Sequence, residues 1–364
     1  MKVALDHRIF SMQRYGGISR YFFELTSRLS SNEVADVSIV SPLYINNYLK
    51  SEPPYSFVRG RYVPYDFAGV RHMVGLANRF AAPFAWSNMD ADIVHETYFT
   101  MLPVGKGGRR VVTVYDMIHE LFAPKVKRLR MGITKRAAID RADHIICISE
   151  TTRRDLIRLY EIDPARTSVV HLGYSLTSAS GGAEVQRTKN RPSLLYVGNR
   201  GGYKNFRTLL AAFSKSQLLR EFELVAFGGP PFAASEHKEI ERLGLTGRVR
   251  YKSGSDAALA ECYRTAVAFV YPSMYEGFGI PPLEAMSHGC PVVCSNAGAI
   301  PEVVSDAGVY FDPENAEELC GTLERVAADD GLQTDLRARG YERTTAFSWA
   351  RCAEDTARIY RKIV

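Results

Sequence analysis

The sequence predicts an α/β protein built from two doubly wound domains, each a parallel sheet covered by helices. At 364 residues the chain is longer than one hydrophobic core usually organises. Short apolar runs rich in Val and Ile alternate with helix-like segments from end to end, as expected for parallel strands that are buried on both faces. The polar stretch 177–191 interrupts this alternation. We therefore expect an N-terminal domain over residues 1–175 and a second domain over 176–345.

Each expected strand is a mostly apolar run of about three to five residues followed by polar or helical sequence. The predicted strands are 3–6, 37–40, 92–94, 111–114, 144–148, 168–172, 194–197, 223–227, 249–251, 268–271 and 291–294. Near the C-terminus, Ser348 stands in N-cap position before an apolar-periodic segment, which predicts a final helix over about 346–364.

Composition excludes several classes of protein. The first residues lack the apolar core of a signal peptide, and no apolar run is long enough to span a bilayer, so we expect a cytoplasmic protein. The six cysteines are scattered without metal-ligand spacing, and we expect reduced, mostly buried thiols. The sequence contains no basic motif interleaved with aromatic residues, so we do not expect nucleic-acid binding.

Positive charge is concentrated in the first half of the chain. Residues 1–172 carry 24 Lys+Arg against 17 Asp+Glu, a net of +7, and the remainder carries 22 against 23, a net of −1. The excess peaks over Lys125–Arg136, where cations mix with Leu129, Met131 and Ile133. Two interpretations fit this segment: a solvated helix face, or a patch for anionic lipid headgroups or a lipid-linked acceptor at the inner face of the plasma membrane.

The most informative stretch is 275–286, which sets two carboxylates eight positions apart. Glu276 lies in a glycine loop, and Glu284 follows two prolines that fit the first turn of a helix. Gly277 and Gly279 lack a Cβ, so this loop, with Phe278 between them, can bring backbone N–H groups close to an anion. The two carboxylates can each accept hydrogen bonds from a diol.

Residues 271–299 resemble the donor-binding signature of the retaining glycosyltransferases of family 4, which have the two-domain GT-B fold. Glu276 and Glu284 match the Glu-x7-Glu pair of that family. The resemblance implies two Rossmann-like domains facing a cleft, with the last helix crossing back onto the first domain. It also implies that Glu284 holds the ribose of a nucleotide sugar and that Glu276 holds the transferred sugar. Glu276 is counted among the catalytic residues, although not as a proton donor.

The loop after the strand 194–197 contains Arg200 and Lys204 among glycines. An arginine fork and a compact ammonium near a helix start suit a diphosphate. The segment resembles the family's Gly…Lys-Asn element, which implies that both cations bind the donor diphosphate, although Arg200 stands one position later than in the commonest version. Such cations stabilise the departing nucleoside diphosphate, so we expect neither a metal nor another cofactor. The Asp90-Ala91-Asp92 sequence is interpreted as a polar turn.

Three further loops are candidates in the first domain. Gly17 belongs to a paired-glycine turn that resembles the loop facing the cleft in this family, where it would contact phosphate. Tyr115 occupies the place of the family's histidine at the end of the strand 111–114, and Asp116 and His119 are the candidates to replace that histidine as catalytic groups. His95 and Glu96 follow the preceding strand and are expected, with Tyr115, to face the acceptor.

These observations predict a retaining hexosyltransferase that uses a nucleotide sugar and a glycan or lipid-linked oligosaccharide acceptor. Residues 14–21 and 197–205 resemble bacterial mannosyltransferase-like enzymes of O-antigen and lipopolysaccharide synthesis, which implies GDP-mannose as donor. The alternatives are UDP-hexose, UDP-N-acetylhexosamine or dTDP-rhamnose as donor, or a catalytically silent sugar-nucleotide binding protein. A nicotinamide dehydrogenase is disfavoured because no Gly-x-Gly-x-x-Gly turn follows the first strand.

Overall fold

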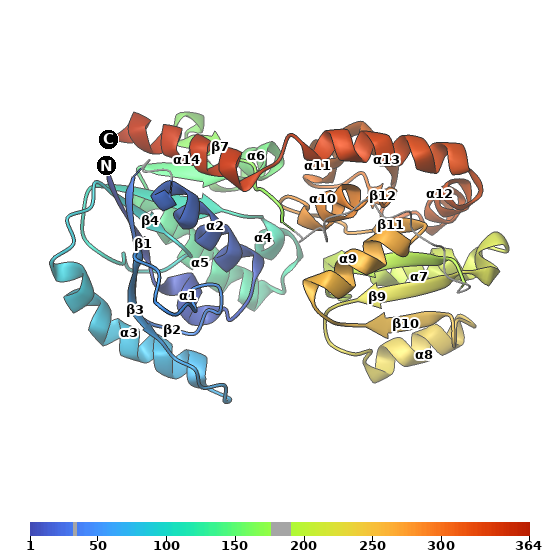
Figure 1. Cartoon of the computed structure of the whole chain (residues 1–364), viewed down its shortest axis with the longest axis horizontal. Coiled ribbons are helices and arrows are strands. Elements are labelled where there is room, and N and C mark those ends of the chain that lie inside the picture. Colours follow the sequence, from blue (N-terminus) through green and yellow to red (C-terminus); the bar gives the residue numbers. More distant parts are fainter. Residues whose placement is uncertain (32–34, 176–190) are drawn as a thin grey trace. The chain divides into compact units, whose positions relative to one another are not determined.

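The computed structural model describes residues 1–31, 35–175 and 191–364, and it divides the chain into two compact units (Figure 1). Unit 1 comprises Met1–Gly173 and Ser348–Val364, and unit 2 comprises Tyr174–Phe347. The polar stretch 177–191 that was predicted to link the domains lies outside the described residues, apart from Arg191.

Unit 1 is a seven-stranded sheet in the order β3-β2-β1-β4-β5-β6-β7, in which every pair of neighbouring strands is parallel. Its strands are β1 (Lys2–Asp6), β2 (Asp36–Tyr44), β3 (Val58–Tyr62), β4 (Ile93–Glu96), β5 (Arg109–Val114), β6 (His144–Cys147) and β7 (Thr167–Val169). Its helices are α1 (Arg8–Met12), α2 (Gly17–Ser31), α3 (Val70–Ser87), α4 (Ile118–Phe122), α5 (Lys125–Arg141), α6 (Glu150–Tyr160), the 3-10 turn η1 (Pro164–Arg166) and α14 (Trp349–Ile363).

Unit 2 is a six-stranded parallel sheet in the order β10-β9-β8-β11-β12-β13. Its strands are β8 (Ser193–Val197), β9 (Glu223–Phe227), β10 (Val249–Lys252), β11 (Ala268–Tyr271), β12 (Val292–Ser295) and β13 (Gly308–Phe311). Its helices are α7 (Phe206–Lys215), α8 (Ala234–Arg242), α9 (Asp256–Thr265), α10 (Ile280–Ser287), α11 (Ile300–Val304), α12 (Ala316–Ala328) and α13 (Asp330–Thr344), with 3-10 turns η2 (Gly202–Lys204), η3 (Leu218–Glu221) and η4 (Ser305–Ala307). The two sheets confirm the predicted doubly wound α/β class.

The last helix belongs to unit 1 although the preceding residues belong to unit 2. Ser348 caps α14 by accepting a hydrogen bond from the Arg351 amide, as its position in the sequence predicted. Trp349 packs near the ring of Tyr21 on α2, and Figure 1 shows the two helices side by side. The fully buried hydroxyl of Tyr360 reaches His95 on β4, so α14 contributes to the core of unit 1.

All six cysteines are free thiols, and five of them are buried, which confirms the prediction from their spacing. Among the described residues no helix combines the length and apolarity needed to cross a membrane.

Candidate active site

The two predicted donor loops of unit 2 follow neighbouring strands. One follows β8 and the other follows β11, and these strands pair in parallel, so their carboxyl ends lie at the same edge of the sheet. The Met274 amide donates a 2.7 Å hydrogen bond to the Tyr203 carbonyl, which joins the loops directly. The two loops, which lie about seventy residues apart in the sequence, are therefore neighbours in unit 2.

Lys204 and Glu276 form an ion pair at the centre of this arrangement. The Lys204 Nζ lies 2.7 Å from Glu276 Oε1, and the side chains are only 20% and 10% exposed. The ammonium also lies 5.2 Å and 5.7 Å from the ring centroids of Tyr203 and Tyr271. Burial, together with the charge of Glu276 and a hydrogen bond to that carboxylate, raises the pKa of Tyr271 well above its usual value. Sequence reasoning missed both tyrosines.

The backbone around Lys204 is fixed by the residue that follows it. Asn205 has a left-handed conformation with φ of 59°, which asparagine tolerates better than most residues. Its side-chain amide donates a 2.7 Å hydrogen bond to the Pro313 carbonyl. This turn ends η2 and begins α7, and so it determines where Lys204 projects.

The glycine loop after β11 is also tightly constrained. Gly279 has φ of 135° immediately before α10, a conformation that favours glycine. At Gly298, with φ of 60°, an added Cβ would lie 2.6 Å from the Glu276 nitrogen, so only glycine allows this close approach. Phe278 is buried and packs edge-on against Phe347. Loop and neighbouring backbone thus hold Glu276 in position.

Glu284 lies in the first turns of α10, which begins at Ile280, as the two prolines predicted. Its side chain is 7% exposed. Gly277 lies between Glu276 and the start of this helix, in the loop that was predicted to approach a phosphate. The structure therefore places both glutamates and the glycine loop in one short segment at the strand edge.

Arg200 is more constrained than its predicted role requires. Its Nε lies 2.7 Å from Glu236 Oε1, and its Nη atoms donate to the carbonyls of Gly228 and Pro230 at 3.1 Å and 2.5 Å. The guanidinium lies 4.7 Å from the Phe232 ring centroid, and the side chain is 2% exposed. These contacts must break before Arg200 can bind a diphosphate, so its donor-binding role stays a prediction.

In unit 1 the paired glycines begin α2. An added Cβ at Gly16 would lie 2.2 Å from Gln13 Oε1, the atom that accepts a hydrogen bond from the Ser19 amide at this helix start. At Gly17 a Cβ would meet nothing within 4 Å. A Cβ at Gly16 would therefore displace the end of the Gln13 side chain, whereas Gly17 has open space beside it.

The loop after β5 carries Tyr115, Asp116 and His119. Tyr115 is 7% exposed, and its hydroxyl donates to the Thr97 carbonyl at 3.4 Å. Asp116 accepts a 2.9 Å hydrogen bond from the Ile118 amide at the start of α4, while the half-buried His119 lies on that helix. Partial burial lowers the pKa of His119, which favours the neutral imidazole.

Lys135 is a residue of this region that sequence reasoning misassigned. It was counted with the basic surface segment, but it is 1% exposed. Its Nζ donates 2.9 Å hydrogen bonds to the Asp116 carbonyl and to Glu120. An internal ion pair therefore ties α5 to the loop that carries Asp116.

The expectation that His95 and Glu96 face an acceptor is corrected by their burial. His95 is fully buried, with Nδ1 2.5 Å from the Tyr360 hydroxyl and Nε2 2.8 Å from Thr113 Oγ1. Glu96 is 2% exposed and accepts hydrogen bonds from Arg110 at 3.0 Å and from Arg141 at 2.7 Å. Both side chains stabilise the interior of unit 1, and neither supplies a surface group.

We expect His95→Asn to flatten the pH dependence of unfolding of unit 1. Burial lowers the pKa of His95 to about 3 from 6.5. Between about pH 5 and 6 the unfolded chain binds this proton and the folded chain does not, so stability falls as pH falls, by up to about 1.4 kcal/mol per pH unit. The measurement is urea unfolding followed by fluorescence of Trp86 and Trp349, the only tryptophans of the chain, which both lie in unit 1.

The matched control is His72→Asn, since His72 is exposed on α3. It should keep the wild-type slope of free energy against pH. An unchanged slope in His95→Asn would contradict the assignment.

The Asp90-Ala91-Asp92 turn has structural partners. Asp90 pairs with Lys2 Nζ at 2.9 Å, and Asp92 accepts a 2.7 Å hydrogen bond from the Lys2 amide. Within residues 1–31, 35–175 and 191–364, no group of three or more His, Cys, Asp or Glu side chains is arranged to hold a metal ion.

Comparisons with known proteins agree with this geometry. Residues 15–178 match the family model described as glycosyltransferase family 4, and residues 183–343 match glycosyl transferases group 1. The chain is 32% identical over 269 residues to O-antigen chain mannosyltransferase B of Escherichia coli, and the matched segment covers 70% of each protein. It is 28% identical over 406 residues to alpha-maltose-1-phosphate synthase of Mycolicibacterium smegmatis, with complete coverage of both. Sucrose-phosphate synthase of Thermosynechococcus elongatus has a similar solved structure, with a TM-score of 0.74 at 20% identity over 100% of this chain and 98% of that one.

Two parallel-sheet α/β units with a glutamate–lysine centre at the strand edge of the second define the class of GT-B glycosyltransferases. Within that class the chain belongs to the glycosyltransferases of family 4, which confirms the resemblance seen in residues 271–299.

Proposed function

We propose that this enzyme is a retaining, metal-independent glycosyltransferase that transfers mannose from GDP-mannose to a hydroxyl of a lipid-linked oligosaccharide in surface polysaccharide synthesis. The 32% identity to an O-antigen chain mannosyltransferase supports mannose. Other relatives carry names with different sugars, such as the maltose phosphate synthase. A UDP-hexose, UDP-N-acetylhexosamine or dTDP-rhamnose is therefore the alternative donor.

The observation that carries the proposal is the 2.7 Å contact between Lys204 and Glu276. It brings the cation assigned to the diphosphate next to the carboxylate assigned to the transferred sugar. A nucleotide sugar carries its negative phosphates next to the hydroxyls of the transferred sugar, so a neighbouring cation and carboxylate suit it. Without donor the two side chains neutralise each other. With donor, the ammonium turns to the phosphate and the carboxylate accepts hydrogen bonds from sugar hydroxyls.

In the proposed reaction the acceptor oxygen attacks the anomeric carbon on the face that the diphosphate leaves. The bond from the anomeric carbon to the phosphate oxygen breaks, and the bond to the acceptor oxygen forms. The acceptor proton passes to the departing phosphate oxygen. Lys204, with backbone N–H groups of the glycine loop that precedes α10, stabilises the charge that develops on that oxygen. Glu284 holds the ribose hydroxyls of the donor.

On unit 1, Asp116 and His119 are assigned to the acceptor side of the reaction, and Gly17 to a phosphate contact. The open space beside Gly17 supports this assignment, because backbone N–H groups at the start of α2 can be approached there. The neutral form of His119 suits a hydrogen-bond acceptor for a sugar hydroxyl.

The basic segment Lys125–Arg136 is assigned to contact with an anionic membrane at its cytoplasmic side, where a lipid-linked acceptor would be found. Lys135 is excluded from this assignment because it is buried. The remaining cations of the segment are all exposed on α5; they are Lys125, Lys127, Arg128, Arg130 and Arg136.

We expect one nucleotide sugar, with GDP-mannose as the leading case, to release its nucleoside diphosphate when protein and acceptor are both present. The measurement is diphosphate release from a panel of labelled nucleotide sugars, with and without a lipid-linked acceptor, followed by the anomeric configuration of the product by NMR. The reaction should persist in EDTA. Tight donor binding without turnover would instead favour the silent binding protein, and an inverted product would contradict retention.

A further inference from the structure

Helix α3 is apolar on two opposite faces. Its inner face, with Val74, Ala82 and Trp86, is buried against the sheet of unit 1. A helix on the surface of a soluble protein usually carries polar residues on the other side. Here the outer face carries four large apolar side chains at helical spacing, which are 60%, 59%, 67% and 80% exposed. They are Met73, Leu76, Phe80 and Phe84.

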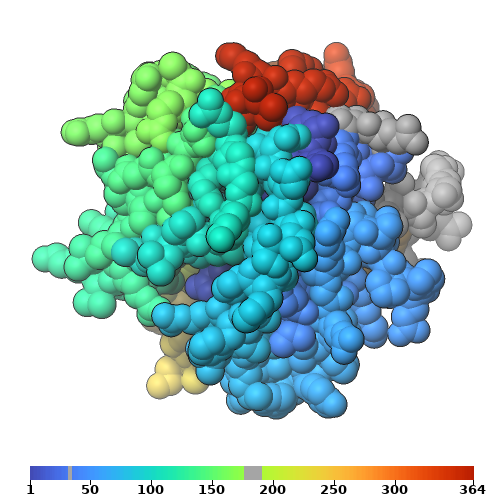
Figure 2. Space-filling view, turned by 90° about the vertical axis from the view of Figure 1, so that its left-hand side faces the viewer, coloured from blue at the N-terminus to red at the C-terminus, as the bar shows by residue number. Residues whose placement is uncertain are grey.

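The connection between β4 and β5 extends this apolar surface. Its Gly105 lies so close to α3 that a Cβ would be 2.5 Å from the Trp86 ring. Earlier in the same loop, Met101 and Leu102 are 55% and 74% exposed. Figure 2 looks onto this side of unit 1, where α3 in light blue, the loop 97–108 in cyan and α5 in teal green lie at the surface.

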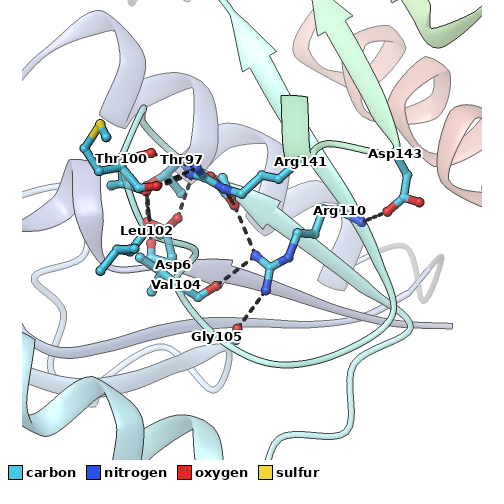
Figure 3. A network of polar contacts seen from close by, with 11 residues as sticks. Asp6, Thr97, Thr100, Leu102, Val104, Gly105, Arg110, Arg141 and Asp143 are labelled. Carbon is cyan, nitrogen blue, oxygen red and sulfur yellow. Dashed lines mark hydrogen bonds and ion pairs between the residues drawn. The ribbon is translucent and has the colours of Figure 1, made fainter. Parts of the chain in front are cut away.

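Two partly buried arginines anchor this loop. Arg110 donates to the carbonyls of Val104 and Gly105 at 3.2 Å and 2.8 Å, and Arg141 donates to the Thr100 carbonyl at 2.7 Å (Figure 3). Leu102 is therefore held at the surface by a backbone that the hydrogen bonds from Arg110 and Arg141 fix in place.

The charged residues of α3 itself are cationic. Residues 70–87 contain Arg71 and Arg79, which are exposed, and no Asp or Glu. The loop adds the exposed Lys106, and Arg141 connects the loop to α5, whose N-terminal half carries further exposed Lys and Arg. Two copies of this chain that met through α3 would bring like charges together. An anionic lipid surface complements both the apolar stripe and the cations.

We propose that the outer face of α3 and the loop 97–105 form a docking surface for an anionic bilayer. Phe80, Phe84 and Leu102 enter the interface between headgroups and acyl chains, while Arg71 and Arg79 pair with lipid phosphates. This surface is separate from the basic segment on α5, and it adds two exposed phenylalanine side chains, Phe80 and Phe84.

The test is flotation of purified protein with vesicles of phosphatidylglycerol and phosphatidylcholine. The double substitution Phe80→Ser and Phe84→Ser should weaken partitioning by at least about tenfold. Arg71→Gln and Arg79→Gln should each weaken it by about fivefold, and pure phosphatidylcholine vesicles should bind wild type poorly. Leu218→Ser is the matched control, since Leu218 is 45% exposed on unit 2, and it should bind like wild type.

Tryptophan fluorescence and urea unfolding verify that each variant is folded, and calorimetry of donor binding should be unchanged in all of them. Loss of vesicle binding with intact donor binding supports the docking surface independently of the donor assignment. Equal partitioning of wild type and the double variant would overturn the proposal. So would a concentration-dependent dimer in sedimentation velocity that the double substitution abolishes, because the occupant would then be a second copy.

Discussion

Lys204→Ala should lower turnover by about 100- to 1000-fold, because an electrostatic group aimed at a developing oxyanion typically contributes that much. The ammonium is only 20% exposed and pairs with Glu276 at 2.7 Å. Its removal takes away the proposed stabilisation of the leaving diphosphate and leaves the carboxylate close to phosphate oxygens. The measurement is diphosphate release at saturating donor and acceptor, with donor affinity measured separately by calorimetry.

Lys215→Ala is the matched control. Lys215 also pairs with a glutamate of unit 2, Glu317, but the two side chains are 48% and 73% exposed. Surface pairs of this kind contribute about 0–1 kcal/mol to stability, and this pair has no assigned part in the reaction. Lys215→Ala should turn over donor like wild type. Wild-type rates in Lys204→Ala would remove Lys204 from the site and would leave the proposed function without its central cation.

Lys204 and Glu276 could be predicted from sequence because each belongs to a local motif at the end of a strand. The apolar runs before them predict β8 and β11, and the carboxyl ends of parallel strands are where ligands bind in such sheets. The pairing of β8 with β11 then brings the two motifs together. Local pattern therefore located the two loops, the family resemblance assigned roles to their residues, and those roles stay predictions.

No local sequence pattern of this kind marks the edge strands or the buried charged residues. The strand β3 reads Val-Arg-Gly-Arg-Tyr and is mostly exposed, so it lacks the apolar run by which most of the other strands were predicted. The edge strand β13 was not predicted either. Lys135 lies in a helix with many cations, and nothing local distinguishes it from its exposed neighbours. Its burial depends on Glu120, which lies on a different helix. The burial of His95 likewise depends on Tyr360, which is 265 residues away in the sequence.

Glu96→Ala should lower the free energy of unfolding of unit 1 by about 3–5 kcal/mol, because it removes the anion from a buried cluster of charges. Glu96 is 2% exposed, and its partners Arg110 and Arg141 are 16% and 15% exposed. Without the carboxylate, two largely buried guanidinium groups remain uncompensated, and the loop that they anchor at Thr100 and Gly105 loses its support. The measurement is urea unfolding followed by the two tryptophans, which report on unit 1 without a contribution from unit 2.

Two further variants serve as comparisons. One keeps the volume of the Glu96 side chain without its charge, and the other removes an exposed carboxylate elsewhere in unit 1. Glu96→Gln keeps the volume and one acceptor oxygen, so its loss should be smaller than that of Glu96→Ala. Glu150→Ala removes the partner of Arg153 in a pair where the carboxylate is 58% exposed, and it should change stability by no more than about 1 kcal/mol. If Glu96→Ala cost no more than Glu150→Ala, the arginines would have to find other partners or solvent, and the loop 97–105 would not be anchored as described. In that case the exposed side chains of Met101 and Leu102 would no longer be held on a fixed backbone, and only the stripe on α3 would remain as a rigid part of the proposed docking surface.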